Sequence, residues 1–129
     1  MKLRIHGNSL RLRLNQAEVA QFSKMGYYED SVQFATGSSF SYAIECATSL
    51  QAPEAVFSNC SLLIRVPYRA GTEWATTDRV EISGDQPLQD GRHLSILIEK
   101  DFRCIHSETP EPDAYPNPLE GASCRHEME

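Results

Sequence analysis

No long apolar run and no secretory-signal pattern is visible in this sequence of 129 residues. No apolar stretch approaches the roughly 20 residues that a membrane-spanning helix needs, so we expect no membrane partner. Residues 1–10 are charged where a secretory signal would have a continuous apolar segment. These absences favour a single bacterial-type domain in the cytoplasm.

Signatures of catalysis are missing as well. The chain has no G-x-S-x-G elbow, no glycine-rich phosphate or dinucleotide loop and no H-E-x-x-H pair. Glu99 and Asp101 share one face of an extended segment, and paired carboxylates perform acid–base chemistry when burial separates their pKa values. A charged strand edge that discourages strand addition is the commoner reason for such a pair. We therefore assign no catalytic residue and favour a non-enzymatic protein, with the question left open.

Charge is present but unevenly placed. The net charge is −6, yet residues 1–24 hold five basic side chains and one acidic one, whereas residues 104–129 hold six acidic side chains and one basic one. The net negative charge of the chain argues against indiscriminate binding of polyanions, because phosphate affinity depends on local cationic charge. The candidate surface for a partner or for nucleic acid consists of four basic residues: Lys2, Arg4, Arg11 and Arg13. The alternatives are that the acidic tail folds back on this patch, or that solvent covers both.

The first quarter of the chain has the clearest local pattern. Strict alternation over residues 2–14 predicts a β-hairpin with one apolar and one basic face. Asn15 and Glu18 form a capping-box pattern, which predicts a helix over Gln16–Met25. Gly26 supplies its C-terminal stop.

The rest of the chain is expected to be mostly strands. A short helical segment is predicted over Tyr68–Thr77 with Trp74 turned inward, and prolines forbid regular structure from Ser107 onward. No internal repeat is evident. We expect an α+β domain over residues 1–106, comprising the N-terminal hairpin, one main helix and a mostly antiparallel sheet of about five or six strands. An irregular, proline-rich acidic tail over 107–129 follows, with docking on the domain as one alternative. The further predicted strands are Ser31–Ala35, Phe40–Ala47, Ser61–Val66, Val80–Ile82 and Leu94–Ile98.

Two Cys-x-His pairs flank the proline-rich tail, and they form the candidate metal site: Cys104, His106, Cys124 and His126. Two thiolates and two imidazoles suit Zn²⁺, or Cu⁺ with fewer ligands. Structural zinc sites more often use C-x₂₋₄-C and H-x₃₋₅-H spacings. Redox pairing of the two cysteines, and no special role for either, therefore remain as alternatives.

Three blocks spread over nearly the whole chain give a family resemblance. They are KLRIHGNSLRLRLNQAEV at residues 2–19, EKDFRC at 99–104 and DAYPNP at 113–118. The chain resembles an uncharacterised family of small bacterial proteins in these blocks. That family implies no activity that can be transferred.

The opening hairpin by itself resembles the swapped-hairpin antitoxins and transition-state regulators of the MazE/AbrB type. The matching positions are Gly7, Asn8, Ser9 and Arg13, and the resemblance implies a dimer whose paired hairpins present arginines to DNA. His6 departs from the usual Trp, and Asn15 departs from the usual Pro.

The sequence as a whole predicts a small accessory or binding protein. It would engage a protein partner through the basic hairpin, or a metal ion through the Cys/His tail. The alternative is a DNA-binding regulator that uses Arg11 and Arg13, with a homodimer as one arrangement of the hairpin.

Overall fold

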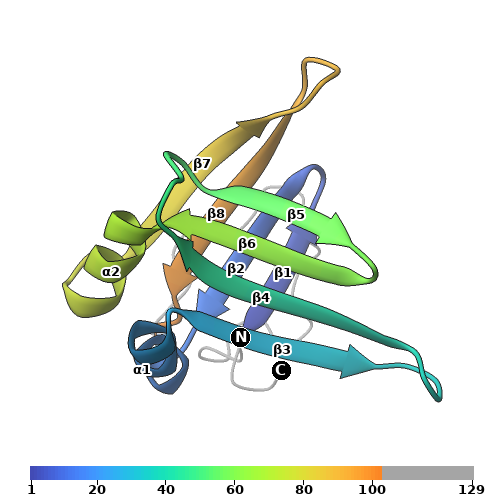
Figure 1. Cartoon of the computed structure of the whole chain (residues 1–129), viewed down its shortest axis with the longest axis horizontal. Helices are drawn as coiled ribbons and strands as arrows, with labels where there is room; N and C mark the ends of the chain where they lie inside the picture. Colours follow the sequence, from blue (N-terminus) through green and yellow to red (C-terminus); the bar gives the residue numbers. More distant parts are fainter. Residues whose placement is uncertain (103–129) are drawn as a thin grey trace, which may run out of the picture.

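Two four-stranded sheets face each other in the computed structural model, and two helices lie together at one end of them (Figure 1). The structure describes residues 1–102. Its strands are β1 (Lys2–His6), β2 (Ser9–Leu14), β3 (Tyr27–Gln33), β4 (Ser39–Ala47), β5 (Glu54–Ser58), β6 (Ser61–Pro67), β7 (Glu81–Pro87) and β8 (His93–Lys100). The helices are α1 (Gln16–Met25) and α2 (Tyr68–Thr76). None of the helices in the described part is long and apolar enough to cross a membrane.

Each sheet is assembled from two antiparallel hairpins joined through a parallel pair. Sheet A has the order β1-β2-β8-β7, and sheet B has the order β3-β4-β6-β5. The parallel contacts are β2 with β8 and β4 with β6. Both parallel pairs are central, so every edge of the two sheets belongs to a hairpin.

The fold repeats itself. β1, β2, α1, β3 and β4 form a first half, and β5, β6, α2, β7 and β8 form a second half with the same order of elements. If each of β1 to β4 is exchanged with its counterpart among β5 to β8, the strand order of sheet A becomes that of sheet B. Backbone hydrogen bonds correspond too, because the Ser95 amide donates to the Asn8 carbonyl at 3.1 Å and the Ser41 amide donates to the Cys60 carbonyl at 3.1 Å. The described chain is therefore a pseudo-two-fold pair of hairpin–helix–hairpin units.

The core lies between the sheets and reaches the helices. Alternation places Leu12, Leu14, Ile64 and Ile98 inward, and each is at most 1% exposed. The same alternation places the intervening side chains on the outer faces of the sheets, where they are available for other contacts.

The two helices meet at corresponding positions of the two halves. Phe22 of α1 and Trp74 of α2 are both buried, and their rings pack edge to face with centroids 5.9 Å apart. The Trp74 indole N–H donates to the Val80 carbonyl at 2.8 Å, which satisfies the one polar group on this ring. The predicted capping box of α1 is present, with Asn15 and Glu18 each bonding the other's backbone amide.

The sheets are held together differently at their two sides. Where β5 and β7 approach, the side-chain amide of Gln86 bonds the backbone of Ala55. Its oxygen accepts from the Ala55 N–H at 2.6 Å, and its nitrogen donates to the Ala55 carbonyl at 3.3 Å, as the backbone of a neighbouring strand would. On the other side, the α-amino group of Met1 is paired with Asp30 at 2.7 Å and with Glu18. These ion pairs raise the pKa of the amine even though burial lowers it.

Several expectations need correction. The α+β class and the N-terminal hairpin are present, but the strands form two mixed sheets of four rather than one mostly antiparallel sheet of five or six. β5 is missing from the prediction, and β3 begins at Tyr27 rather than Ser31. An internal repeat is present in the topology although the sequence does not reveal it. The reason is that corresponding outer-face residues differ between the halves, as Arg4 and Val56 do, while corresponding inward residues share only their apolar character. The tail over 107–129 lies outside the described residues.

Candidate binding face

The outer face of sheet A carries the basic residues that the sequence singles out. Three rows of directly opposed side chains cross this face from β1 to β7: Lys2–Arg13–Glu99–Glu81, Arg4–Arg11–Leu97–Ser83 and His6–Ser9–Ser95–Asp85. The β1–β2 hairpin therefore supplies the cations, and β8 and β7 supply the carboxylates. We call the four cations Lys2, Arg4, Arg11 and Arg13 the basic strip.

Within the strip, like charges are placed opposite each other. Lys2 is opposite Arg13, and Arg4 is opposite Arg11. Like charges at directly opposed positions of neighbouring strands are destabilising, by a few tenths of a kcal/mol up to about 1 kcal/mol. This arrangement is costly for the fold by itself, so it needs compensation from elsewhere.

Two carboxylates, Glu99 near the end of β8 and Asp101 just after it, provide part of that compensation. Glu99 Oε2 lies 2.8 Å from Arg13 Nε and 3.4 Å from Arg11 Nε, and Asp101 Oδ2 lies 3.0 Å from Lys2 Nζ. Glu99 hydrogen-bonds to Arg13, so Arg11 is held only by the longer charge contact. Among the described residues, Arg11 makes no side-chain hydrogen bond and Arg4 makes no ion pair. Arg4 is therefore the exposed cation of the strip without a carboxylate partner in the described part, and Arg11 is partly exposed with only a long contact to Glu99.

Sheet B provides an internal comparison because its residues stand at corresponding positions. The strip residues correspond in order to Glu54, Val56, Leu63 and Arg65. Only Arg65 retains the charge, and it lies 4.0 Å from both Glu45 and Glu54. The same fold thus carries a cationic surface on one hairpin and a mixed apolar and acidic surface on the other.

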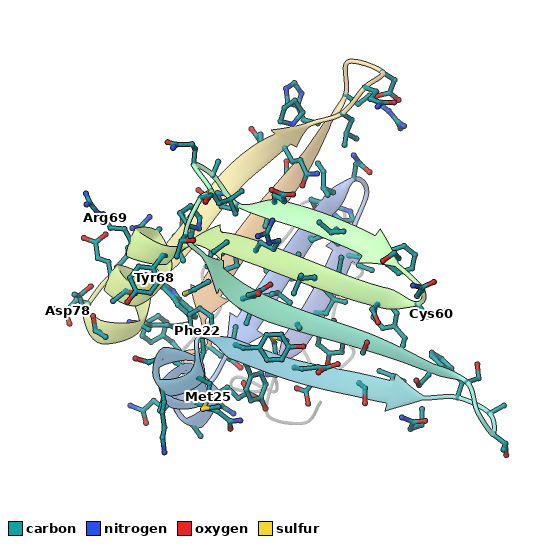
Figure 2. The ribbon with its side chains drawn as sticks, in the orientation of Figure 1. Phe22, Met25, Cys60, Tyr68, Arg69 and Asp78 are labelled. Carbon is teal, nitrogen blue, oxygen red and sulfur yellow. The ribbon has the colours of Figure 1, made fainter. Side chains whose placement is uncertain are left out.

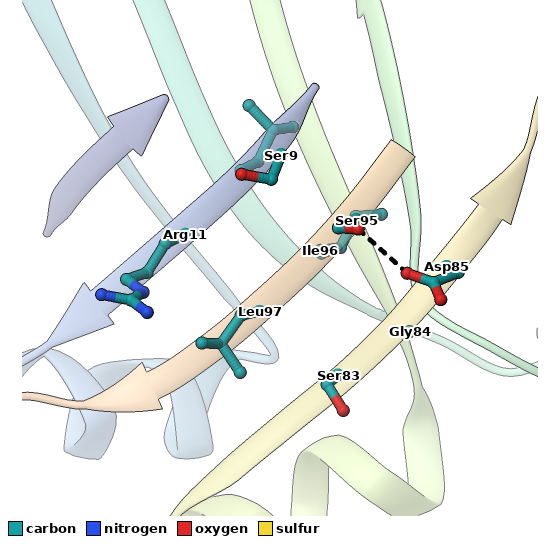
Figure 3. A pocket seen from close by; sticks show the side chains of 9 residues that line it. Ser9, Arg11, Ser83, Gly84, Asp85, Ser95, Ile96 and Leu97 are labelled. Atoms are coloured by element: carbon teal, nitrogen blue, oxygen red, sulfur yellow. Dashed lines mark hydrogen bonds between the residues drawn. The ribbon is translucent and has the colours of Figure 1, made fainter. Parts of the chain in front are cut away.

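A shallow hollow of about 350 Å³ opens on the same face of sheet A, between β2, β8 and β7 (Figure 3). Ser9 and Arg11 form one side, Ser83 and Asp85 form the other, and Ser95 and Leu97 lie between them. Leu10, Gly84 and Ile96 complete the lining. The Ser95 hydroxyl donates to Asp85 at 3.0 Å, whereas Ser9 donates to the His6 carbonyl at 2.6 Å. The sequence did not point to Asp85 or the serines, because they become neighbours of Arg11 only through the β2–β8 pairing.

The four cysteines fall into two groups. Cys46 is half-buried under α2, where it packs against the core, and burial raises the pKa of its thiol. Cys60 is exposed in the turn between β5 and β6, at the end of sheet B away from the helices (Figure 2). Cys104, His106, Cys124 and His126 lie outside the described residues, so the metal site stays a prediction. Within residues 1–102, no cluster of three or more metal-ligating side chains is present.

Comparison with known families gives one match. A model described as a family of unknown function (DUF7009) covers residues 1–119. The chain belongs to this family. Membership of DUF7009 confirms the resemblance to an uncharacterised family, and the match extends past the last described strand. No curated protein and no solved structure matches the chain.

Proposed function

We propose that this member of DUF7009 is a small non-enzymatic binding protein that docks an acidic segment of a protein partner on the basic strip. The observation that carries the proposal is the placement of Lys2 opposite Arg13 and Arg4 opposite Arg11. Such pairs oppose folding, and the equivalent hairpin of sheet B forms the same structure without them. An anionic partner would offset the repulsion that Glu99 and Asp101 compensate only in part.

The surface chemistry favours an acidic polypeptide as the occupant. Arg4 and Arg11 offer fork-shaped donors that match carboxylates, and electrostatic complementarity of this kind steers association and selects partners. Leu97 lies beside them in the same row and adds apolar contact. Carboxylates of β8 and β7 border the strip, so a broad anionic surface would meet repulsion on half of the face, whereas a short acidic segment can lie along β1 and β2 alone.

A fluorescein-labelled octaglutamate peptide tests the proposal by fluorescence anisotropy. The R4A/R11A variant should raise the Kd about 2- to 30-fold, since each exposed ion pair contributes about 0.2–1 kcal/mol. R65A is the matched control, because Arg65 stands at the position of sheet B that corresponds to Arg13. Binding that is unchanged in R4A/R11A, or lost equally in R65A, would overturn the proposal.

DNA is the second candidate, on the observation that Arg11 and Arg13 share the outer face of one hairpin. Against it, Glu99, Glu81 and Asp85 lie on the same outer face, and a duplex laid over this face would meet their negative charge. A duplex titration separates the candidates: DNA binding would weaken steeply with salt and disappear in R11A/R13A. Octaglutamate binding without duplex binding would favour the protein partner.

The Cys/His tail is proposed separately to bind zinc or copper. Native mass spectrometry of the full chain, before and after chelator, tests this directly. One metal-sized mass per chain that is absent from C104S/C124S, together with lower thermal stability after chelation, would support the site. C46S/C60S serves as the matched cysteine control, and retention of the metal by C104S/C124S would argue against the assignment.

A further inference from the structure

The hollow on sheet A distinguishes the two halves of the molecule more sharply than charge alone. At the corresponding place on sheet B, the Ser41 and Ser61 hydroxyls bond each other at 2.7 Å. Their counterparts in sheet A, Ser95 and Ser9, turn to other partners and leave space between them. Sheet B has the same backbone arrangement with this pair of serines closed, so the fold does not require the hollow of sheet A.

Opposite charges stand on the two sides of this hollow. Arg11 comes from β2 and Asp85 from β7, with Ser95 and Leu97 of β8 between them (Figure 3). In sheet B the corresponding positions are Leu63, Ser31, Ser41 and Ala43, none of which is charged. The hollow therefore has Arg11 on the side that can bind a carboxylate and Asp85 on the side that can bind a hydrogen-bond donor or cation. Leu97 forms an apolar floor between them.

We propose that this hollow binds a Glu-x-Lys pair in the docked segment. The acidic side chain would pair with Arg11, and the basic side chain would pair with Asp85. The inference rests on the proposed function and names the kind of segment that its surface prefers. The partner segment is then acidic where it meets the basic strip and carries a basic residue two positions from one of its acidic residues.

The spacing follows from strand geometry. β2 and β7 are separated by one strand, and Arg11 and Asp85 stand in adjacent rows, so their Cα atoms lie about 12 Å apart. Side chains at positions i and i+2 of an extended segment project to one side and are about 7 Å apart. Asp85 turns inward to accept from Ser95, whereas the Arg11 side chain extends along β2 toward Glu99 (Figure 3). The acidic side chain of the segment must therefore reach outward to Arg11. The short Ser95 side chain leaves room for the segment.

Three blocked peptides of equal length test the inference by NMR titration of the full-length ¹⁵N-labelled protein. They contain Glu-Gly-Lys, Glu-Gly-Gln or Gln-Gly-Lys between Gly-Ser flanks, and the shifts of the Ser95 and Leu97 amides report binding. Glu-Gly-Lys should bind about 2- to 5-fold more tightly than either single-charge peptide, which is the range for one exposed ion pair.

Substitutions taken from sheet B provide the matched variants. D85S should abolish the preference for Glu-Gly-Lys over Glu-Gly-Gln, while R11L should abolish the preference over Gln-Gly-Lys. Both residues lie on the surface, and unchanged amide shifts on sheet B would show that the fold is retained. R65L, on the other sheet, should leave both preferences unchanged.

Two outcomes would overturn the inference. One is equal affinity for Glu-Gly-Lys and Glu-Gly-Gln; the other is a preference that persists in D85S. Either would leave the proposed function standing as long as octaglutamate binding still depends on Arg4 and Arg11. Loss of that dependence would instead remove the proposed function itself, so the two failures are distinguishable.

Discussion

The outer faces of the two sheets have the same backbone arrangement and opposite chemistry. On sheet A, the middle row begins Arg4–Arg11, whereas the corresponding row of sheet B begins Val56–Leu63. The inner rows differ far less, because Leu12 and Ile64 are both buried aliphatic residues at corresponding positions. The comparison shows that the core constrains side chains in both halves, while the outer faces are free to diverge toward binding.

The halves also differ in how their arginines are neutralised. Arg13 and Glu99 approach to 2.8 Å, whereas their counterparts Arg65 and Glu45 are 4.0 Å apart. Glu99 is more enclosed, with 15% of its side chain exposed against 39% for Glu45. The same ion pair is therefore tighter on the face that concentrates positive charge, and this is the side where its removal should matter more.

The largest effect should come from breaking the contact at which the halves meet. W74A removes a fully buried indole and should reduce the free energy of unfolding by about 3–5 kcal/mol. F22A should fall in the same range, with W74A the more costly because Val80 also loses its indole donor. Urea denaturation measures both, and M25A on the exposed face of α1 is the control. A cost below about 1 kcal/mol for W74A would contradict a shared core.

The next effect concerns Gly71, which corresponds to Val19 in the first half. A Cβ at position 71 would lie 2.7 Å from Cys46 Sγ and 3.0 Å from Val66 Cγ2. G71A should therefore destabilise by about 1–3 kcal/mol through overpacking, although alanine is the better helix former. Urea denaturation gives the sign directly. A stabilised G71A would mean that α2 does not approach the sheet this closely.

A smaller effect separates the two ion pairs. E99Q should cost about 1 kcal/mol, because it leaves Arg11 and Arg13 without their shared carboxylate. E45Q, the matched change on sheet B, should stay within about 0.5 kcal/mol. Under the proposed function, E99Q should also tighten octaglutamate binding while lowering stability. Equal stability costs for the two variants would remove the asymmetry described above.

The smallest effect distinguishes two thiols of sheet B, Cys46 on β4 and Cys60 in the turn between β5 and β6. Burial raises the pKa of Cys46, while Cys60 is exposed in its turn. Iodoacetamide should modify Cys60 at least about tenfold faster at pH 8, since the thiolate is the reactive form. The rate at Cys46 should continue to rise with pH beyond the ordinary thiol pKa of 9.0. Peptide mass spectrometry measures both sites, and faster modification of Cys46 would contradict its burial.

Local structure followed closely from local sequence. Alternation in residues 2–14 predicted the first hairpin, the Asn15 and Glu18 pattern predicted the start of α1, and Trp74 was correctly placed inward. β5 was missed because Glu54–Ser58 is short and carries little alternation. The basic strip was identified residue by residue, while its carboxylate neighbours and the hollow were not.

The sequence by itself determined which side chains of each strand face the core, because side-chain direction alternates along any extended segment. It also determined that Lys2, Arg4, Arg11 and Arg13 share one face of a hairpin. Only the tertiary structure decided that β2 pairs in parallel with β8, a contact between opposite ends of the described chain. That pairing brings Glu99 to the basic strip and Asp85 across from Arg11. Long-range pairing depends on the packing of whole hairpins, and no local pattern encodes it.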